Sequence, residues 1–143
     1  MPQNLVIPST HRKTGLVVIA HADDLVLFAG AAVLALIDAG WEIHVIRATD
    51  DRWDSWGIDA EETIARNQSE FRSALASLGI SKVYDLGLAT DQLGDQSEVE
   101  LRNRIVDLIR SIRPYLIVTF DPDSIKYEDN EDHRLVEIGR AHV

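Results

Sequence analysis

The sequence predicts an α/β fold, because short apolar runs alternate with helical patterns along the chain. Four apolar runs of strand length and four helical segments follow one another alternately within 143 residues. The length fits a single domain, and 45% hydrophobic residues is enough for a buried core. Strands and helices that alternate in this way predict a parallel sheet.

The predicted strands are short and rich in β-branched residues. Residues 16–20 are apolar at every position, which is typical of a strand covered on both faces. Such a strand needs helices on both sides of its sheet, so we expect a Rossmann-like three-layer sandwich with a mainly parallel sheet flanked by helices. The other strands are expected at residues 42–48, 82–86 and 115–120.

The predicted helices carry recognisable start and stop signals. A serine followed three residues later by a glutamate is a capping box, and glycine just after an apolar stripe is a common helix end. The expected helices are residues 25–39, closed by Gly40; a long helix opened by Asp59 or Ala60 and closed by Gly79; a helix capped by Ser97 with Glu100 and ended by Pro114; and a helix from Asp132 onward.

We expect one domain over residues 15–143, preceded by an N-terminal extension of residues 1–14. The sequence ends at Val143 within the last predicted helix, with no cap or stop signal, which favours a truncated piece that lacks C-terminal strands. Missing strands would leave a sheet edge unpaired, and such edges drive pairing between chains. A homo-oligomer is therefore a further expectation.

The composition excludes several classes of protein. A net charge of −10 argues against binding to nucleic acid or to anionic membranes, since both reward basic patches. The absence of cysteine excludes disulfides, thiolate metal sites and cysteine nucleophiles. With no signal-peptide pattern and no apolar run of membrane-spanning length, a cytoplasmic protein acting on a small molecule is the default expectation.

Two polar clusters follow predicted strands and suggest a metal site. His21 and Asp24 are three residues apart directly after the first strand, and His133 lies beyond the fourth. Ligands in such folds bind beyond the carboxyl ends of the strands, so both clusters can share one crevice. Two imidazoles and one carboxylate suit zinc or another divalent transition metal, and three protein ligands leave room for water and substrate.

Asp23 precedes the predicted ligand Asp24 and is placed to act as a general base. Other interpretations stay open at this point. Two aspartates before a helix also serve as an N-cap, and a histidine opening a helix is often a surface residue. The aspartate-rich residues 121–132 lack the ligand spacing and central glycine of a calcium loop.

The motifs then become specific to one family. The chain resembles the PIG-L family, the zinc-dependent LmbE-like de-N-acetylases, from about Gly15 to its end. The stretches that carry the resemblance are Ala20-His-Ala-Asp-Asp24 after a strand, Arg113-Pro-Tyr-Leu-Ile-Val-Thr-Phe-Asp-Pro122, and Asp132-His133-Arg134.

The resemblance implies that His21, Asp24 and His133 bind zinc and that Asp23 is the general base. It further implies hydrolysis, by metal-activated water, of the N-acetyl group of an N-acetylglucosamine-like or related amide. Free amine and acetate would result.

The sequence departs from the family pattern at several positions. Ala22 replaces the usual proline and Leu25 the usual glutamate, while Asn130 stands where a histidine normally helps to stabilise the tetrahedral oxyanion. An asparagine amide still donates a hydrogen bond, so we expect Asn130 in that catalytic role. Tyr127 lies one residue from a family tyrosine that helps to polarise the carbonyl, and Arg66 lies beside the place of a sugar-binding arginine, here Asn67.

Other candidate site residues come from strand ends. Arg52 and Trp53 follow the second strand and are candidates to bind hydroxyl groups and to stack on a sugar ring, although tryptophans also pack loops onto a protein body. Asp121 follows the fourth strand and is expected to orient a metal-binding histidine.

Two alternative functions stay open from the sequence. Asn130 and Leu25 motivate an inactive or weakly active relative that binds metal or ligand without turnover. Hydrolysis of a phosphoester at the same metal is a further alternative, although no basic phosphate cradle accompanies the site.

Overall fold

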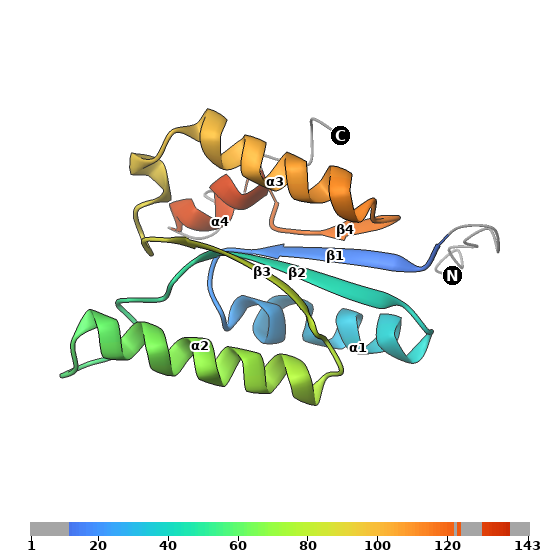
Figure 1. Ribbon diagram of the computed structural model, residues 1–143, viewed down its shortest axis with the longest axis horizontal. Helices are drawn as coiled ribbons and strands as arrows, with labels where there is room; N and C mark the ends of the chain where they lie inside the picture. The colour runs from blue at the N-terminus through green and yellow to red at the C-terminus, as the bar shows by residue number, and fades with distance from the viewer. Residues whose placement is uncertain (1–11, 122, 124–129, 138–143) are drawn as a thin grey trace.

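The computed structural model describes residues 12–121, 123 and 130–137, and it confirms the predicted α/β fold (Figure 1). Four strands form one parallel sheet in the order β3-β2-β1-β4. The elements are β1 (Thr14–Ile19), η1 (Leu25–Ala29), α1 (Gly30–Asp38), β2 (Glu42–Thr49), α2 (Ala60–Ser77), β3 (Lys82–Leu88), η2 (Leu93–Asp95), α3 (Glu98–Ile112), β4 (Leu116–Val118) and α4 (Glu131–Val136).

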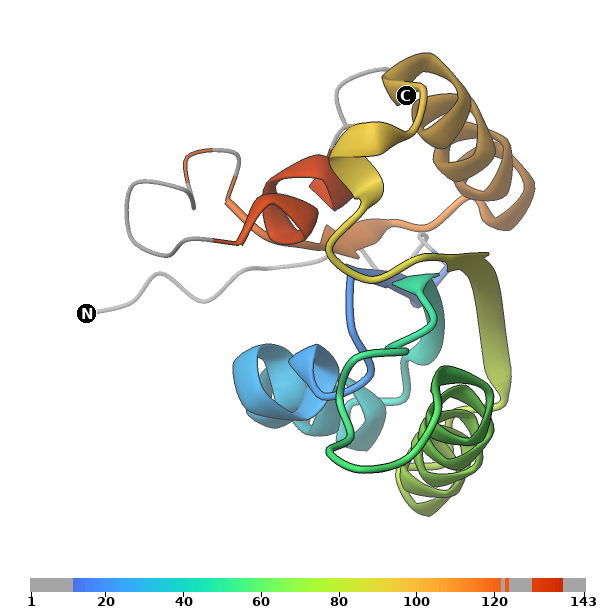
Figure 2. The ribbon, with the colours of Figure 1, turned by 90° about the vertical axis from the view of Figure 1, so that its left-hand side faces the viewer.

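The sheet is the middle layer of a three-layer sandwich. Helices α1 and α2 cover one face, and α3 and α4 cover the other (Figure 2). The strand order reverses between β1 and β4, because β2 and β3 extend the sheet on one side of β1 while β4 pairs on the other side. This switch point is where doubly wound folds bind ligands.

β1 is buried on both faces, as its continuous apolar sequence predicts. Leu16 and Val18 belong to the core cluster under α3 and α4, whereas Val17 and Ile19 belong to the cluster under α1 and α2. Successive side chains of a strand point to opposite faces, so a strand between two helical layers must be apolar at every position.

The helix predicted over residues 25–39 is divided in the structure. Its first turn is the π-helical η1, and the α-helical hydrogen bonding of α1 begins only at Gly30. Asp24 occupies the N-cap position, but its side chain makes no cap hydrogen bond there because the carboxylate faces back to the preceding loop. Single π-helical turns of this kind are frequent at functional sites.

The fourth strand is shorter than the predicted residues 115–120. Only Leu116–Val118 pair with β1, and the Thr119 hydroxyl then donates to the Val18 carbonyl oxygen at 3.1 Å. A side chain thus takes a place that the backbone ladder would otherwise fill, which ends β4. By contrast, β2 and β3 run one and two residues beyond their predicted ends, at Thr49 and Leu88.

The predicted helix caps are confirmed. The Asp59 side chain accepts the Glu62 N–H at 2.9 Å, and the Ser97 hydroxyl accepts the Glu100 N–H at 3.3 Å. None of the helices within the described residues is both long and apolar enough to cross a membrane.

Burial on α3 predicts a sharp contrast between two of its aliphatic residues. Ile105 is 0% exposed in the core beneath the helix, whereas Val99 is 53% exposed. Ile105→Ala should therefore lower the free energy of unfolding by about 3 kcal/mol, and Val99→Ala by less than about 0.5 kcal/mol, in urea melts. Equal effects of the two substitutions would contradict the packing of α3.

Candidate active site

The turn after β1 is built around one buried carboxylate. Asp24 is 2% exposed, and its Oδ2 accepts the backbone N–H groups of Ala20 at 3.1 Å and His21 at 2.8 Å. These two bonds close the turn on itself. They place the side chains of His21 and Asp24 together at the carboxyl end of the central strand.

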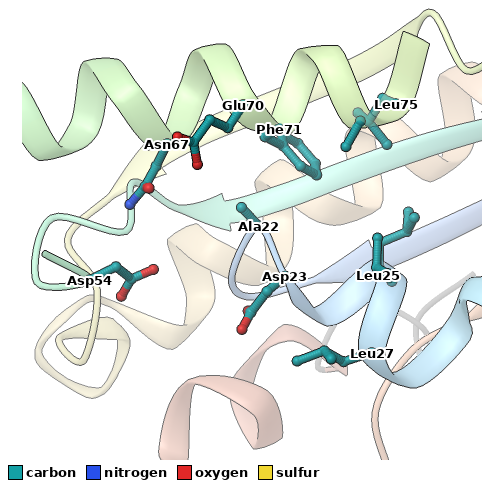
Figure 3. A pocket seen from close by; sticks show the side chains of 11 residues that line it. Ala22, Asp23, Leu25, Leu27, Asp54, Asn67, Glu70, Phe71 and Leu75 are labelled. Carbon is teal, nitrogen blue, oxygen red and sulfur yellow. The ribbon is translucent and has the colours of Figure 1, made fainter. Parts of the chain in front are cut away.

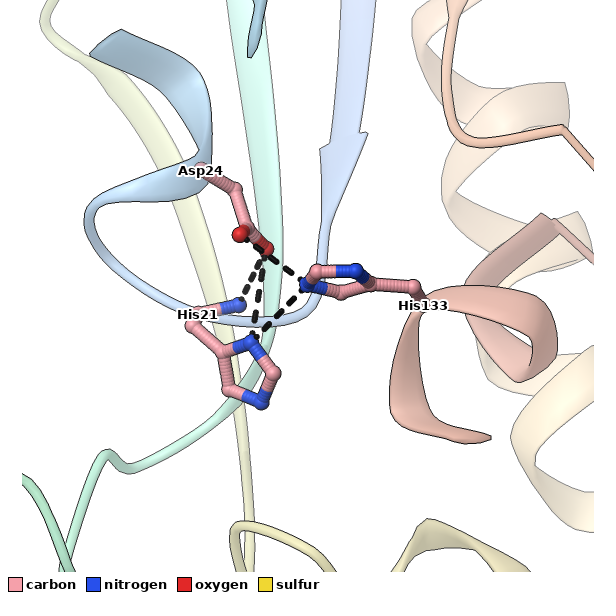
Figure 4. A group of neighbouring side chains, drawn as sticks. All are labelled: His21, Asp24 and His133. Atoms are coloured by element: carbon pink, nitrogen blue, oxygen red, sulfur yellow. Dashed lines mark hydrogen bonds and ion pairs between the residues drawn. The ribbon is translucent and has the colours of Figure 1, made fainter. Parts of the chain in front are cut away.

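His133 reaches the same place from α4 (Figure 4). Its Nε2 lies 3.2 Å from His21 Nδ1 and 3.1 Å from Asp24 Oδ1. Asn130 caps α4, because its side-chain oxygen accepts the His133 N–H at 3.4 Å. One ligand atom from each of His21, Asp24 and His133 lies within 4.8 Å of the other two, and all three residues are buried.

Two aromatic rings fix the plane of the His133 imidazole. Phe120 stacks on it with ring centroids 3.9 Å apart and an interplanar angle of 7°, and Phe28 meets it edge-on at 5.9 Å. Neither ring was predicted as part of the site. The signal in the sequence was their position, since Phe120 lies two residues after the end of β4 and Phe28 lies one turn after Asp24.

Asp132 orients His21 from the opposite side. Its Oδ2 lies 3.3 Å from His21 Nε2 and also accepts the Asp91 N–H at 2.7 Å, while Oδ1 accepts the Leu93 N–H at 3.2 Å. This contact occupies Nε2 and leaves Nδ1 to face the cluster. A carboxylate on the second nitrogen is the usual support of a metal-binding histidine.

The electrostatics of the cluster couple His21 to its two carboxylate neighbours. Burial alone would lower the pKa of His21, but hydrogen bonds to Asp132 and Asp24 raise it to about 10. Burial alone would raise the pKa of Asp24, but hydrogen bonds from His133 and His21 lower it to about 2. A protonated His21 therefore faces the ionised carboxylate of Asp24.

The donor set fits a divalent transition metal. Two imidazole nitrogens and one carboxylate oxygen converge from His21, His133 and Asp24, and such donors suit zinc better than magnesium or calcium, which prefer all-oxygen shells. A cation there would take over from the proton on His21 in offsetting the negative charge of Asp24.

Asp23 lies at the open side of this turn. Its side chain is exposed and lines a cavity of about 450 Å³ between the turn and α2. The carboxyl group next to Asp24 in sequence therefore faces solvent-accessible space, whereas Asp24 itself is buried. This arrangement suits a group that exchanges protons with a ligand.

The loop after β2 holds Arg52 and Trp53 outside that cavity. The Arg52 guanidinium pairs with Asp50, with Nη2 2.6 Å from Oδ2, and the Trp53 indole N–H donates to the Thr90 carbonyl at 3.2 Å. Their roles in sugar binding stay predictions. Arg66 pairs with Glu62 on the exposed face of α2.

The remaining predicted residues have different surroundings. Asp121 is exposed, and its Oδ1 accepts the Asp123 N–H at 2.8 Å. The carboxylate that contacts His21 is that of Asp132. An orienting role for Asp121 stays a prediction. Tyr127 lies outside the described residues.

Asp51 supports the same turn from the end of β2. Its Oδ2 accepts the Ala22 N–H and an Arg47 Nη1–H, each at 3.1 Å, and the residue is 0% exposed. Its φ of 57° is in the left-handed region, which is strained for a residue other than glycine. Burial raises the pKa of Asp51 to about 6, although the Arg47 guanidinium acts in the opposite direction.

Comparison with known proteins identifies the family of this chain. The family model described as GlcNAc-PI de-N-acetylase, PIG-L, matches residues 16–142. The chain belongs to the PIG-L family. This confirms the resemblance that the sequence motifs indicated.

A relative of this PIG-L chain is found in Mycobacterium tuberculosis. Over 128 residues the chain is 32% identical to 1D-myo-inositol 2-acetamido-2-deoxy-alpha-D-glucopyranoside deacetylase, covering 73% of this chain and 42% of the relative. The chain thus spans less than half the length of that relative.

Solved structures share the fold of this PIG-L chain. N,N'-diacetylchitobiose deacetylase from Pyrococcus horikoshii matches with a TM-score of 0.79 and 27% identity, over 90% of this chain and 47% of the other. The 4-carboxy-2-hydroxymuconate hydratase GalB from Pseudomonas putida matches with a TM-score of 0.74 and 22% identity, over 90% and 55%. The fold therefore accompanies more than one chemistry, and function must be argued from the site.

The cluster predicts metal binding that depends on His133. Purified protein loaded with zinc should bind close to one equivalent, and His133→Ala should weaken binding more than about a hundredfold, since even the loss of an outer partner of a ligand costs 10- to 100-fold. Competition with a chromophoric chelator measures both. His44→Ala is the matched control, because His44 is also buried but contacts Glu42 and Tyr84 near the start of β2. Equal loss in both variants would contradict the site.

The raised pKa of Asp51 predicts a pH-dependent cost to stability. Its pKa is about 6 in the folded protein against an ordinary 3.8, so the native state favours the protonated form. Its contribution to stability should fall by about 2 kcal/mol as the pH rises from about 4 to about 6, and stay low above that range. In urea melts, Asp51→Asn should therefore gain about 2 kcal/mol relative to wild type between about pH 4 and pH 7.5. A difference between the two proteins that does not vary with pH would contradict this.

Proposed function

We propose that this chain carries the metal and general-base part of a zinc-dependent deacetylase that removes an N-acetyl group from an amino-sugar amide. The observation that carries the proposal is the convergence of His21, Asp24 and His133 at the switch point of the sheet, with Asp23 exposed beside them. Membership of a family described as GlcNAc-PI de-N-acetylase supports the reaction class.

His21 through Nδ1, Asp24 through a carboxylate oxygen and His133 through Nε2 would hold the ion. When bound, a zinc ion supplies Lewis acidity, which polarises a carbonyl oxygen and acidifies water. Asp132 keeps the His21 ring in the orientation that presents Nδ1. Phe120 does the same for His133 by stacking.

Asp23 is assigned as the general base. Its carboxylate takes a proton from the water that attacks the amide carbon, and it delivers that proton to the nitrogen as the C–N bond breaks. One water is consumed, and one amine and one acetate are formed. The exposed position of Asp23 at the cavity wall gives it access to both water and substrate.

Asn130 is assigned as a donor to the oxyanion of the tetrahedral intermediate. Its side-chain oxygen is engaged by the His133 N–H, which leaves the amide nitrogen as the group able to donate. A neutral amide stabilises an oxyanion through hydrogen bonding only, whereas a protonated imidazole also adds charge.

Substitution of Asp23 separates base catalysis from metal binding. Asp23→Asn should keep the zinc stoichiometry of wild type and lower kcat/KM for acetate release from N-acetylglucosamine by about 10²- to 10⁴-fold, the usual contribution of a general base. Asp38→Asn removes an exposed carboxylate at the end of α1 and should leave turnover unchanged.

Two results would overturn these assignments. Full turnover by Asp23→Asn would remove Asp23 as the base. If zinc-loaded wild type releases no acetate from any amide tested, the chain is a metal-binding relative without hydrolysis.

A further inference from the structure

The cavity beside Asp23 has an apolar part and an acidic part (Figure 3). It measures about 450 Å³, a volume typical of small-molecule sites, and lies between the turn after β1, the loop after β2 and α2. Leu25, Phe71 and Leu75 form an apolar wall, and the first and last of these are 1% exposed.

The polar part of the cavity is acidic. The carboxylates of Asp23, Asp54 and Glu70 line it, and no lysine, arginine or histidine is present among the described residues that do so. Figure 3 shows Asn67 and Glu70 on α2, with the Asn67 amide directed at the loop after β2. Any ligand in the cavity therefore meets three carboxylates.

The nearby positive charges are paired elsewhere. Arg66 pairs with Glu62, and Arg72 Nη2 donates to Asp85 Oδ2 at 2.9 Å. The Asn67 amide donates to the Asp51 carbonyl oxygen at 3.0 Å. None of these donors is therefore directed at a ligand in the cavity.

The acidic wall is electrostatically continuous with the metal cluster. Burial raises the pKa of Asp54, and the negative charges of Asp23, Asp91 and Asp24 raise it further, against the opposing effect of His21. The Asp54 carboxyl group therefore interacts electrostatically with the proposed base, Asp23, and with Asp24 in the turn after β1. A substrate whose acyl group reaches Asp23 would place its remaining part against Asp54, Glu70 and the apolar wall.

We propose that this cavity binds the non-acyl part of the amide and selects substrates by charge, accepting a cationic or neutral group with an apolar face and rejecting an anionic one. This inference rests on the proposed deacetylase function for the placement of the acyl group. The selectivity itself follows from like-charge repulsion at close range between the three carboxylates and an anionic group.

The test uses three glycosides whose para substituents are of similar size and differ in charge. They are the 4-(aminomethyl)phenyl, 4-(hydroxymethyl)phenyl and 4-carboxyphenyl β-glycosides of N-acetylglucosamine, which carry a positive, a neutral and a negative group at neutral pH. Ligand-observed NMR on the zinc-loaded protein measures Kd, and acetate release on the same samples measures kcat/KM. The amine should bind at least about tenfold more tightly than the carboxylate, with the Kd of the alcohol between the two. Added salt should bring the Kd values of the amine and the carboxylate closer together.

Two variants locate the effect and one serves as a control. Asp54→Asn and Glu70→Gln should each reduce the ratio of the carboxylate's Kd to the amine's Kd by at least about threefold, because each removes one wall charge. Glu61→Gln removes an exposed carboxylate in the first turn of the same helix, outside the cavity, and should leave the ratio unchanged.

The outcomes separate this proposal from the proposed function. Equal binding of the three glycosides, no binding of any, or ratios unchanged in Asp54→Asn and Glu70→Gln would overturn the charge selectivity, whether or not acetate is released. The expected order of Kd without acetate release would support the cavity's selectivity and overturn the deacetylase assignment.

Discussion

The carboxylate of Asp24 is the group on which the whole site depends. One oxygen accepts two backbone N–H groups of the preceding turn, and the other meets the imidazole of His133 from a helix more than a hundred residues later. A single ionised group thus sets the local turn and the long-range contact together. Hydrogen bonds to an ionised carboxylate are stronger than those between neutral groups. Here they keep the pKa of Asp24 at about 2 despite its burial.

The sheet makes this contact possible. β1 lies between β2 and β4, so the turn after it opens at the point where the strand order reverses. Helices on both faces bury the strand completely, which leaves its carboxyl end as the place where polar side chains can gather. Asp51, in the loop after β2, accepts a hydrogen bond from the turn. Asp132 orients His21, and Phe120 orients His133. Each metal-ligand candidate therefore has a partner that limits its freedom.

The division between buried and exposed carboxyls assigns different chemistry to neighbouring residues. Asp24 is buried and held by donors, whereas Asp23 faces the cavity. The π-helical first turn of η1 follows directly, with Asp23 C=O accepting the N–H groups of Val26 and Leu27. Solved structures of this fold include both deacetylases and a hydratase, so the fold alone does not determine the reaction.

Local sequence patterns were enough to predict the strands, the helices and their caps. The all-apolar run of β1, the Asp59 and Ser97 caps and Gly40 express short-range physics, namely side-chain alternation, hydrogen bonding to free N–H groups and backbone conformation. The motif around His21 and the later His133 also indicated the family. Where local rules failed, a tertiary contact had replaced them, as when the Thr119 hydroxyl ended β4.

The partners of the site were decided only by the tertiary structure. Asp51 and Phe28 lie outside the motif stretches, and Asp132 and Phe120 lie inside them without a predicted role. Each acquires its role from a residue distant in sequence. The structure also decides the surroundings of Arg66. This residue lies on the exposed face of α2, where it pairs with Glu62 one turn earlier and does not line the cavity. The sequence by itself determined the fold class and the candidate ligands, since these depend on periodicity and strand ends. The folded chain decided which carboxylate faces which imidazole, because that depends on distances between segments that periodicity does not encode.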